Sequence, residues 1–240
     1  MKIIELEKID STNNYAKEYL KNNILEEELI IFTNFQESGR GNGTNSWHSE
    51  KSKNLLFSII AKPLITPEEY FKINMSVTLS IYKYLKIKNI DVKIKWSNDI
   101  YFENKKLCGI LIENIIIGNL LTYTIIGIGL NVNETKFPKK LPNPISMMEI
   151  KKCEYNLKEE LYFLSKIIIN NLKNDSIITI QELKKEFISV LYQFGKFYKY
   201  KTQGSIFWGK IIDVEDLGNL VIETQTSEIK TFAYKEVEFI

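Results

Sequence analysis

The chain has 240 residues, a formal net charge of +2 at pH 7 and two cysteines. Acidic and basic residues are interleaved, which argues against a dedicated nucleic-acid surface. Cys108 and Cys153 lie far apart without metal-ligand spacing, which favours a reducing compartment over a disulfide framework. The N-terminus has no continuous apolar segment, and polar residues interrupt the most apolar run at 115–130. We therefore predict a cytoplasmic protein with no membrane partner.

The first part of the chain predicts strands and helices in alternation. A strand at 2–8 leads into "DSTNNYAKEYL", a helix capped by one of the residues 10–12. The β-branched and aromatic runs "ELIIFTNF" and "NLLFSIIA" are typical of strands. The loop of 36–53 between them has a length that is usual for functional or mobile loops. Pro67 then begins a helix that extends to about residue 88.

The next part predicts an antiparallel meander followed by two helices. "DVKIKW", a short "IYF" and the turn "ENKK" precede two long apolar strands that are joined at residues 118 and 119. Residues 132–147 are expected to be irregular. Amphipathic helices are predicted at about 157–173 and 179–194.

The last part of the chain predicts a separate small β domain. Short strands with a turn at 217–219 indicate a β barrel or sandwich in residues 195–240. Residues 1–194 are expected to form the larger domain. The fold class predicted for that domain is α+β, with a mixed, largely antiparallel sheet flanked by helices.

The loop "FQESGRGNGTNSWHSE", residues 35–50, holds the only arginine and the only histidine of the chain. Arg40 lies between two glycines, and a planar guanidinium offers a fixed fork of donors to a carboxylate or phosphate. The glycines let the backbone approach the same ligand, so the segment predicts an anion-binding loop; the alternative is a solvated surface loop. "GRGNGT" matches neither the dinucleotide-binding nor the P-loop pattern, and His48 has no partner at metal-ligand spacing.

The stretch "KWSNDI", residues 95–100, ends a predicted strand with a cation, an aromatic residue and an Asn-Asp pair. If it is extended, Lys95, Ser97 and Asp99 share one face, and the alternative is a turn. A hairpin at "ENKK" brings Lys106 back beside Asp99. A cation and a carboxylate at one end of the sheet are suited to holding a phosphate and positioning an amine.

The stretch "GIGLNVN", residues 127–133, has two glycines inside a predicted strand. Glycine weakens a strand unless another group must approach the backbone there. In that case Asn131 would point at the approaching group. The alternative is a β-bulge.

Taken together, four motifs resemble biotin protein ligases in content, order and spacing. They are "STN" at 11–13, "Q..GRG.....W.S...NL.FS" at 36–58, "KW.NDIY....K..GIL.E" at 95–113 and "GIGLNVN" at 127–133. Residues 205–222 look like the small C-terminal domain of that family, an SH3-like β barrel. The resemblance covers nearly the whole chain and implies that residues 1–194 bind biotin and ATP.

The resemblance implies an ATP-dependent, AMP-forming ligase. Such enzymes activate the biotin carboxylate with Mg-ATP to give biotinyl-AMP and pyrophosphate. They then pass the biotinyl group to a lysine of the biotin carboxyl carrier protein of a carboxylase. Biotin, ATP and Mg²⁺ are the implied small molecules, and Mg²⁺ is expected to arrive with ATP rather than in a protein metal site. The first step brings two anions together, so fixed cations have to offset their repulsion.

The resemblance also assigns residues to the reaction. Arg40, Lys106 and Asp99 are the implied catalytic residues, with Asp99 organising Mg-ATP and later the incoming lysine amine. All the implied site residues precede residue 132, so removing 196–240 is expected to impair ATP use more than biotin binding. The implied nucleotide-binding residues are Trp47, Asn98 and Asn131, and the implied biotin-binding residues are Ser11, Thr12, Asn13, Gln36, Gly39, Arg40, Gly41, Asn42 and Lys106.

The chain departs from the family pattern at two positions. Asn42 stands where the family often has a second arginine, which leaves less positive charge in the loop, and Ser97 stands where it often has proline. Some members also carry an N-terminal winged-helix domain that binds DNA. Because "STN" begins at residue 11, there is no room for it, and no DNA partner is expected.

The sequence leaves two alternative functions open. One is a lipoate or octanoyl protein ligase or transferase of related fold; an octanoyl transferase needs a reactive cysteine, and Cys108 is expected on the strand face of Lys106. The other is a non-catalytic module that binds biotin or the carrier. The identity of the carboxylase and the formation of a homodimer through the long strands are left open by the sequence.

Overall fold

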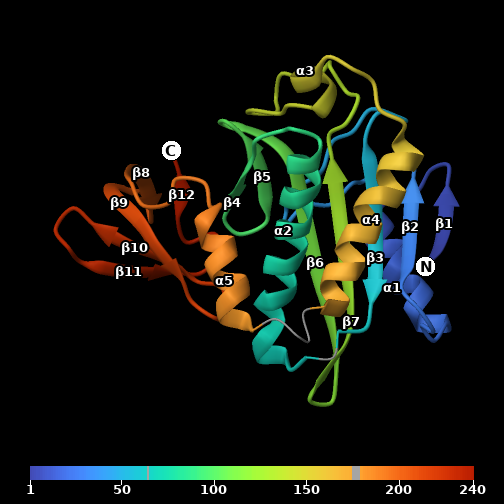
Figure 1. Cartoon of the computed structure of the whole chain (residues 1–240), viewed down its shortest axis with the longest axis horizontal. Helices are drawn as coiled ribbons and strands as arrows, with labels where there is room; N and C mark the ends of the chain where they lie inside the picture. The colour runs from blue at the N-terminus through green and yellow to red at the C-terminus, as the bar shows by residue number, and fades with distance from the viewer. Residues whose placement is uncertain (64, 175–178) are drawn as a thin grey trace.

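The computed structural model describes residues 1–63, 65–174 and 179–240 (Figure 1). A seven-stranded sheet has the order β1-β2-β3-β7-β6-β5-β4, in which only β1 and β2 are parallel neighbours. The predicted fold class is therefore confirmed. The strands are β1 (Lys2–Leu6), β2 (Leu29–Thr33), β3 (Leu55–Ala61), β4 (Lys93–Lys95), β5 (Asp99–Phe102), β6 (Lys105–Ile117) and β7 (Leu120–Leu130).

Helices cover both faces of this sheet. Helices α2 and α4 lie on one face and α1 lies on the other (Figure 1). Among the described residues, no helix combines the length and the apolar character needed to cross a membrane. The helices are α1 (Thr12–Asn22), α2 (Tyr70–Ile87), α3 (Met147–Lys151), α4 (Leu157–Asn174) and α5 (Ile180–Ser189), with a 3₁₀ turn at Pro67–Glu69 before α2.

The helices differ from the predictions in two places. The short helix α3 was not predicted, although Ser146 and Glu149 form a capping box at its start. The helix predicted for 179–194 ends at Ser189, because the next residues run beside the edge strand β4. The backbone N–H of Ile94 donates to the carbonyl of Val190, at 3.0 Å, and Tyr192 donates to Ile94, at 2.8 Å. These contacts replace the last helical turn.

The side chains of strand β2 pack into two hydrophobic cores, one on each face of the sheet. All of its residues are buried, because helices cover both faces. Leu29 and Ile31 pack into the cluster beneath α1, whereas Ile30 and Phe32 join the larger core beneath α2 and α4. This alternation follows from the two-residue period of a strand.

A second, five-stranded sheet has the order β11-β10-β9-β8-β12 and is fully antiparallel. The predicted turn at 217–219 joins two of its strands. The division of the chain between residues 194 and 195 stays a prediction. The backbone N–H of Gly195 donates to the carbonyl of Ile211, so the first residue after this division is bonded to the small sheet. Its strands are β8 (Phe197–Thr202), β9 (Ser205–Val214), β10 (Leu220–Thr224), β11 (Ile229–Phe232) and β12 (Glu238–Phe239).

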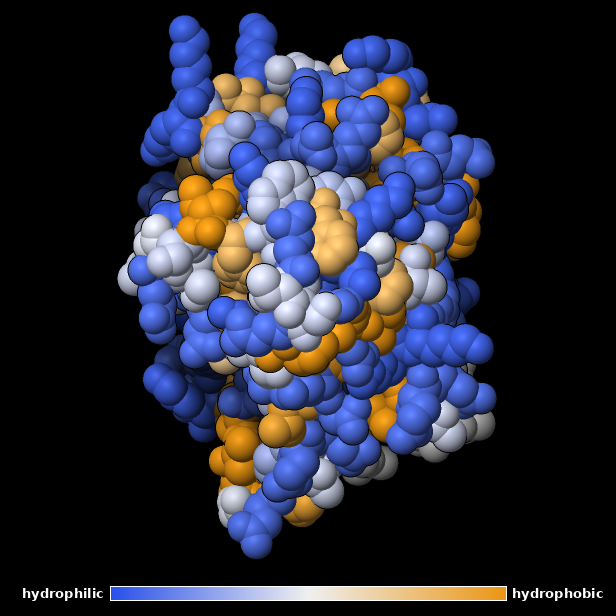
Figure 2. Space-filling view, turned by 90° about the vertical axis from the view of Figure 1, so that its left-hand side faces the viewer, coloured by the Kyte–Doolittle hydropathy of each residue, from blue (hydrophilic) through white to orange (hydrophobic). Residues whose placement is uncertain are grey.

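The outer side of the small sheet mixes apolar and charged groups (Figure 2). Phe197 and Trp208 are 41% and 44% exposed. A lysine lies over each ring, with Lys210 Nζ 5.4 Å from the centroid of Phe197 and Lys199 Nζ 5.5 Å from that of Trp208. The lysines break the apolar surface into small areas.

The turn at 217–219 packs against the large sheet and its helix α2. The Tyr70 hydroxyl donates to the carbonyl of Leu217, at 2.7 Å, and the Trp96 indole donates to that of Gly218, at 2.9 Å. Gly218 has φ +87°, and a Cβ there would lie 2.5 Å from Cδ2 of the buried Phe71. Glycine is thus required at this junction for its conformation and for its size.

We expect Gly218→Ala to destabilise the protein more than Gly204→Ala. Both glycines have positive φ, but nothing lies within 4 Å of a Cβ at Gly204. For the control, Gly204→Ala, the free energy of unfolding should fall only by the cost of holding alanine at a positive φ, about 1–2 kcal/mol. Gly218→Ala should lose roughly 1–3 kcal/mol more through overlap with Phe71. Chemical denaturation of both variants measures this, and equal losses would contradict the packing of the turn on α2.

Candidate functional site

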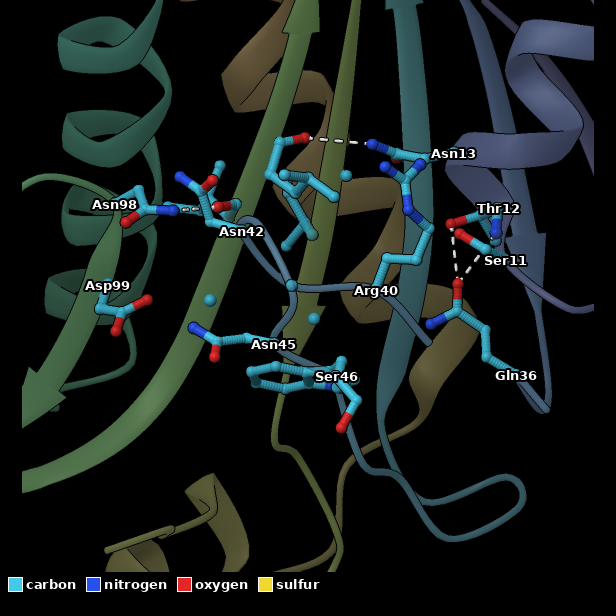
Figure 3. Close-up of a pocket in the computed structure, with 18 of the residues that line it drawn as sticks. Ser11, Thr12, Asn13, Gln36, Arg40, Asn42, Asn45, Ser46, Asn98 and Asp99 are labelled. Atoms are coloured by element: carbon cyan, nitrogen blue, oxygen red, sulfur yellow. Dashed lines mark hydrogen bonds between the residues drawn. The ribbon is translucent and has the colours of Figure 1, made fainter. Parts of the chain in front are cut away.

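A pocket opens on the α1 face of the large sheet (Figure 3). Its floor follows from the strand register. Gly109 of β6 pairs with Gly129 of β7, and Gly127 of β7 lies between Leu111 of β6 and Ser58 of β3. The glycines share one face with the α1 cluster, and because they carry no side chain they leave space above the sheet. The pocket is the part of this face that α1 leaves uncovered.

The polar wall of the pocket comes from the start of α1 and from Gln36. The backbone N–H and the hydroxyl of Thr12 donate to Gln36 Oε1, at 2.9 and 3.2 Å (Figure 3). The Ser58 hydroxyl lies 2.7 Å from Thr12 Oγ1 and 2.6 Å from Asn13 Oδ1. Ser11 occupies the N-cap position, yet its side chain makes no capping bond. Its hydroxyl therefore stays available in the pocket wall.

The glycine-rich loop forms a tight hairpin beside this wall. The N–H of Gly41 donates to the carbonyl of Asn45, and that of Trp47 to the carbonyl of Gly39, each at 2.8 Å. A Cβ at Gly39 would lie 2.5 Å from the Trp47 carbonyl oxygen. Gly39 is therefore needed for hairpin closure and does not line the pocket, unlike Arg40, Gly41 and Asn42.

The end of the loop is anchored by a buried carboxylate that the sequence did not single out. Glu134 accepts from the backbone of Glu50 at 3.0 Å and from the Asn54 amide at 2.5 Å. His48 Nε2 lies 3.4 Å from the other carboxylate oxygen. The single histidine thus contacts the loop anchor.

The indole of Trp47 lies directly on the glycine floor. A Cβ at Gly109 would lie 2.8 Å from Trp47 Cζ3, and a Cβ at Gly129 would overlap the indole. A Cβ at Gly127 would overlap the Asn13 amide in the same way. Asn13 and Trp47 are thus the groups that approach the strand backbone at Gly127 and Gly129, where any larger residue would overlap them. The alternative of a β-bulge is wrong, because pairing through these glycines is regular.

Lys106 and Asp99 meet at one end of the pocket, as the predicted hairpin requires. Residues 96–98 form the turn between β4 and β5 rather than an extended strand end. Lys106 Nζ lies 2.8 Å from Asp99 Oδ1. Burial by itself would lower the pKa of Lys106, but the Asp99 carboxylate outweighs burial and raises it. Lys106 is therefore a fixed cation.

Arg40 lies at the opposite end of the pocket and is paired with Glu113. Its NH2 and NH1 atoms donate to the two oxygens of Glu113, at 2.8 and 3.1 Å, and NH1 also donates to Asn14, at 2.9 Å. The side chain points towards Asn13 and away from Asp99 (Figure 3). The charges of Arg40 and Lys106 are thus not combined at one point: each is bound to a carboxylate of the protein.

Glu113 closes the motif at 95–113, but no role in the site was predicted for it. Besides Arg40, it accepts from Lys17 Nζ at 2.8 Å and from Asn13 Nδ2 at 2.9 Å. Burial alone would raise its pKa, but the hydrogen bonds from Lys17, Arg40 and Asn13 outweigh burial and lower it. The available signal was the strand period, which puts a carboxylate of an apolar strand on the face of Gly109 and Leu111.

Asn98 and Asn131 are both held by the backbone. Asn98 Nδ2 donates to the carbonyl of Ile110, at 2.5 Å, at the edge of the pocket. Asn131 Nδ2 donates to the carbonyl of Ile145, at 3.0 Å, and does not line this pocket. It lines a neighbouring cavity that shares Trp47 and Lys106.

Two further expectations are wrong. Cys108 does not share a face with Lys106, because the β5–β6 pairing shifts register between them and turns Cys108 into the core beneath α2. The thiol is buried, and burial raises its pKa, which disfavours the reactive thiolate. The pocket lining is also not confined to residues before 132, since Tyr234 from the small sheet contributes to it.

Among the described parts of the chain, no group of three or more His, Cys, Asp or Glu side chains is placed to hold a metal ion. Asp99 is the one carboxylate that lines the pocket there, and Lys106 already binds one of its oxygens. Arrival of Mg²⁺ together with ATP fits this arrangement and stays a prediction.

Comparison with known proteins identifies the class. Residues 5–131 match the model of the biotin/lipoate A/B protein ligase family, and the chain belongs to this family. It is 26% identical over 229 residues to the bifunctional ligase/repressor BirA of Bacillus spizizenii, covering 94% of this chain and 70% of BirA. It is 26% identical to the human biotin–protein ligase over 85% of this chain and 29% of the human protein.

A solved structure resembles the chain throughout. The biotin protein ligase from Aquifex aeolicus in complex with biotin and ATP superposes with a TM-score of 0.81 at 27% identity. The similarity covers 100% of this chain and 98% of the Aquifex chain. Both sheets therefore fall within the resemblance.

We expect Glu113→Gln to destabilise the protein by about 1–3 kcal/mol at neutral pH, because it weakens charge-assisted bonds to Arg40 and Lys17. The pKa of Glu113 is lowered from 4.5, so this stabilisation is complete above pH 4.5 and is lost as the pH falls through the lower folded value. Wild type and variant should converge in acid. Glu37→Gln, at an exposed pair with Lys8, is the control and should cost under ~1 kcal/mol.

Denaturant unfolding at a series of pH values measures both variants. A Glu113→Gln loss that persists unchanged in acid would show that the carboxylate charge does not stabilise this end of the pocket.

Proposed function

We infer that this chain is a biotin protein ligase, which activates biotin with ATP and transfers the biotinyl group to a lysine of a protein. One observation carries the inference. A glycine-floored pocket joins a wall of buried hydroxyl and amide groups to a fixed Lys106–Asp99 pair. The wall suits a polar ring system, and the pair suits a carboxylate that meets a phosphate.

The biotin head group is proposed to bind against the start of α1. A ureido group presents two N–H donors and one carbonyl acceptor, and it needs partners when buried. Ser11, Thr12 and Gln36 offer both kinds of partner within one wall. The side chain of biotin is then proposed to run towards Lys106 over Gly109 and Gly129, from which the Trp47 indole has to lift.

The first chemical step is proposed at the Lys106 end. A biotin carboxylate oxygen attacks the α-phosphorus of ATP, a P–O bond to that oxygen forms, and the α–β bridging bond breaks to release pyrophosphate. Lys106 offsets the negative charge shared by the carboxylate and the α-phosphate. Mg²⁺ bound with ATP would add positive charge at the phosphates. Asp99 holds the Lys106 ammonium in place.

In the second step, the amine of the acceptor lysine attacks the acyl carbon, the C–O bond to AMP breaks, and the amine loses a proton. Asp99, the one carboxylate among the described residues that line the pocket, is proposed to orient that amine. The acceptor is proposed to be a biotin carboxyl carrier protein, and a cytoplasmic location remains a prediction.

Arg40 and Trp47 are proposed to move during the reaction. Arg40 has to leave Glu113, or share it, before its guanidinium reaches the anions at the Lys106 end. Trp47 now rests on the floor, and covering an adenylate requires the indole to lift. The adenine is proposed to enter the neighbouring cavity, which Trp47, Asn131 and Pro144 help to line.

The rival octanoyl transferase activity is not favoured, because Cys108 is buried on the opposite face of the sheet from the pocket. A non-catalytic binding module would have no need for the fixed Lys106–Asp99 pair.

The protein should biotinylate one lysine of a biotin carboxyl carrier domain when biotin and Mg-ATP are both present. Mass spectrometry of the carrier measures the product, with reactions lacking ATP or biotin as controls. Transfer of lipoyl or octanoyl groups without any biotinyl transfer would overturn the inferred function.

Lys106→Ala should slow biotinyl-AMP formation by about 3 kcal/mol, or more than a hundredfold, because it removes a cation at the reacting centre. Lys105→Ala, at the exposed neighbour on the same strand, is the matched control and should keep its rate. Biotin-dependent exchange of pyrophosphate into ATP measures both. An undiminished rate in Lys106→Ala would exclude the proposed role.

A further inference from the structure

The connection between β11 and β12 of the small sheet reaches the pocket. Tyr234, in this connection, lines the pocket together with Asn98, Asp99 and Lys106. Its ring centroid lies 6.2 Å from that of Trp96, which holds the connection against the large sheet. Burial, followed by the Asp99 charge, raises the pKa of Tyr234, so its hydroxyl remains a donor at neutral pH. The small sheet therefore contributes directly to the site.

The next residue, Lys235, lies at the tip of the glycine-rich loop. A Cβ at Gly43 would overlap Lys235 Nζ and lie 3.2 Å from Lys235 Cε. Gly43 has φ +66° and follows Asn42, which lines the pocket. The ammonium of Lys235 thus contacts the loop backbone at the point where the hairpin turns.

The cations near the pocket differ in whether a carboxylate of the protein pairs with them. Arg40 is the only lysine or arginine in residues 36–48, and Glu113 pairs with it. Asp99 partly offsets Lys106. Within the ranges that the structure describes, Lys235 has no carboxylate within ion-pair distance; besides the loop backbone at Gly43, its Nζ approaches the Tyr234 ring, at 5.9 Å from the centroid. Lys235, next in the chain to the pocket residue Tyr234, is thus a cation whose charge no described acid neutralises.

We propose that Lys235 binds the terminal phosphates of ATP, and then the departing pyrophosphate, when the glycine-rich loop closes over the nucleotide. This rests on the proposed ligase function. The α-phosphate is assigned to Lys106, so the β- and γ-phosphates extend from the Asp99 end, where Tyr234 and Lys235 approach from the small sheet. A polyphosphate needs more positive charge than the Lys106–Asp99 pair provides. The Tyr234 hydroxyl is a second donor beside it.

Lys235 is suited to a substitution test because it is exposed and outside any strand. Replacing it should leave the fold intact. In biotin-dependent pyrophosphate exchange by the full chain, Lys235→Ala should raise the KM for ATP about tenfold and leave the KM for biotin within about twofold. Lys235→Arg should restore the KM for ATP to within about threefold. Lys199→Ala, on the outer side of the same sheet, is the matched control and should match wild type.

The outcomes separate this proposal from the proposed function. Absence of exchange in the wild-type protein would remove the ligase function itself. An active wild type with an unchanged KM for ATP in Lys235→Ala would overturn the phosphate contact alone. Equal rises in both KM values would also overturn it, because they would show that Lys235 only holds the loop in place. Failure of arginine to restore ATP binding would count against a role through charge.

Discussion

The site depends on three positions of one sheet face that carry no side chain. Gly109, Gly127 and Gly129 lie in adjacent rows of β6 and β7, and Trp47 or Asn13 rests against each of them. A methyl group at any of them would displace an element that builds the pocket. The loop hairpin and the start of α1 can therefore reach the sheet only because the strands lack volume there, and this constraint sets where a ligand fits.

Charge is arranged in the pocket as two separate pairs. Lys106 is held by Asp99 at one end and Arg40 by Glu113 at the other. In a partly buried site, an unpaired cation would be costly, so internal carboxylates act as its counter-ions. An incoming anion has to compete with them. Under the proposed function, binding is coupled to an exchange of partners, which links substrate occupancy to the position of the loop that carries Arg40.

The small sheet belongs to the architecture of the site. Its turn at 217–219 is fixed to α2 and to Trp96, and this attachment places the β11–β12 connection over the Asp99 end of the pocket. Under the proposed function, loop closure and nucleotide binding therefore involve both sheets. A chain without the small sheet would keep the polar wall but lose part of the pocket rim.

The sequence by itself determined the elements and the pairings that are local. Strand and helix types followed from periodicity, and the Lys106–Asp99 pair followed from one short hairpin, since few residues separate the partners. Only the tertiary structure decided which groups meet across long separations: Glu113 with Arg40, Trp47 with Gly129, and Lys235 with Gly43. It also decided the orientation of Cys108, because a one-residue register shift moves a side chain to the other face of a sheet and leaves no trace in the pattern of the strand.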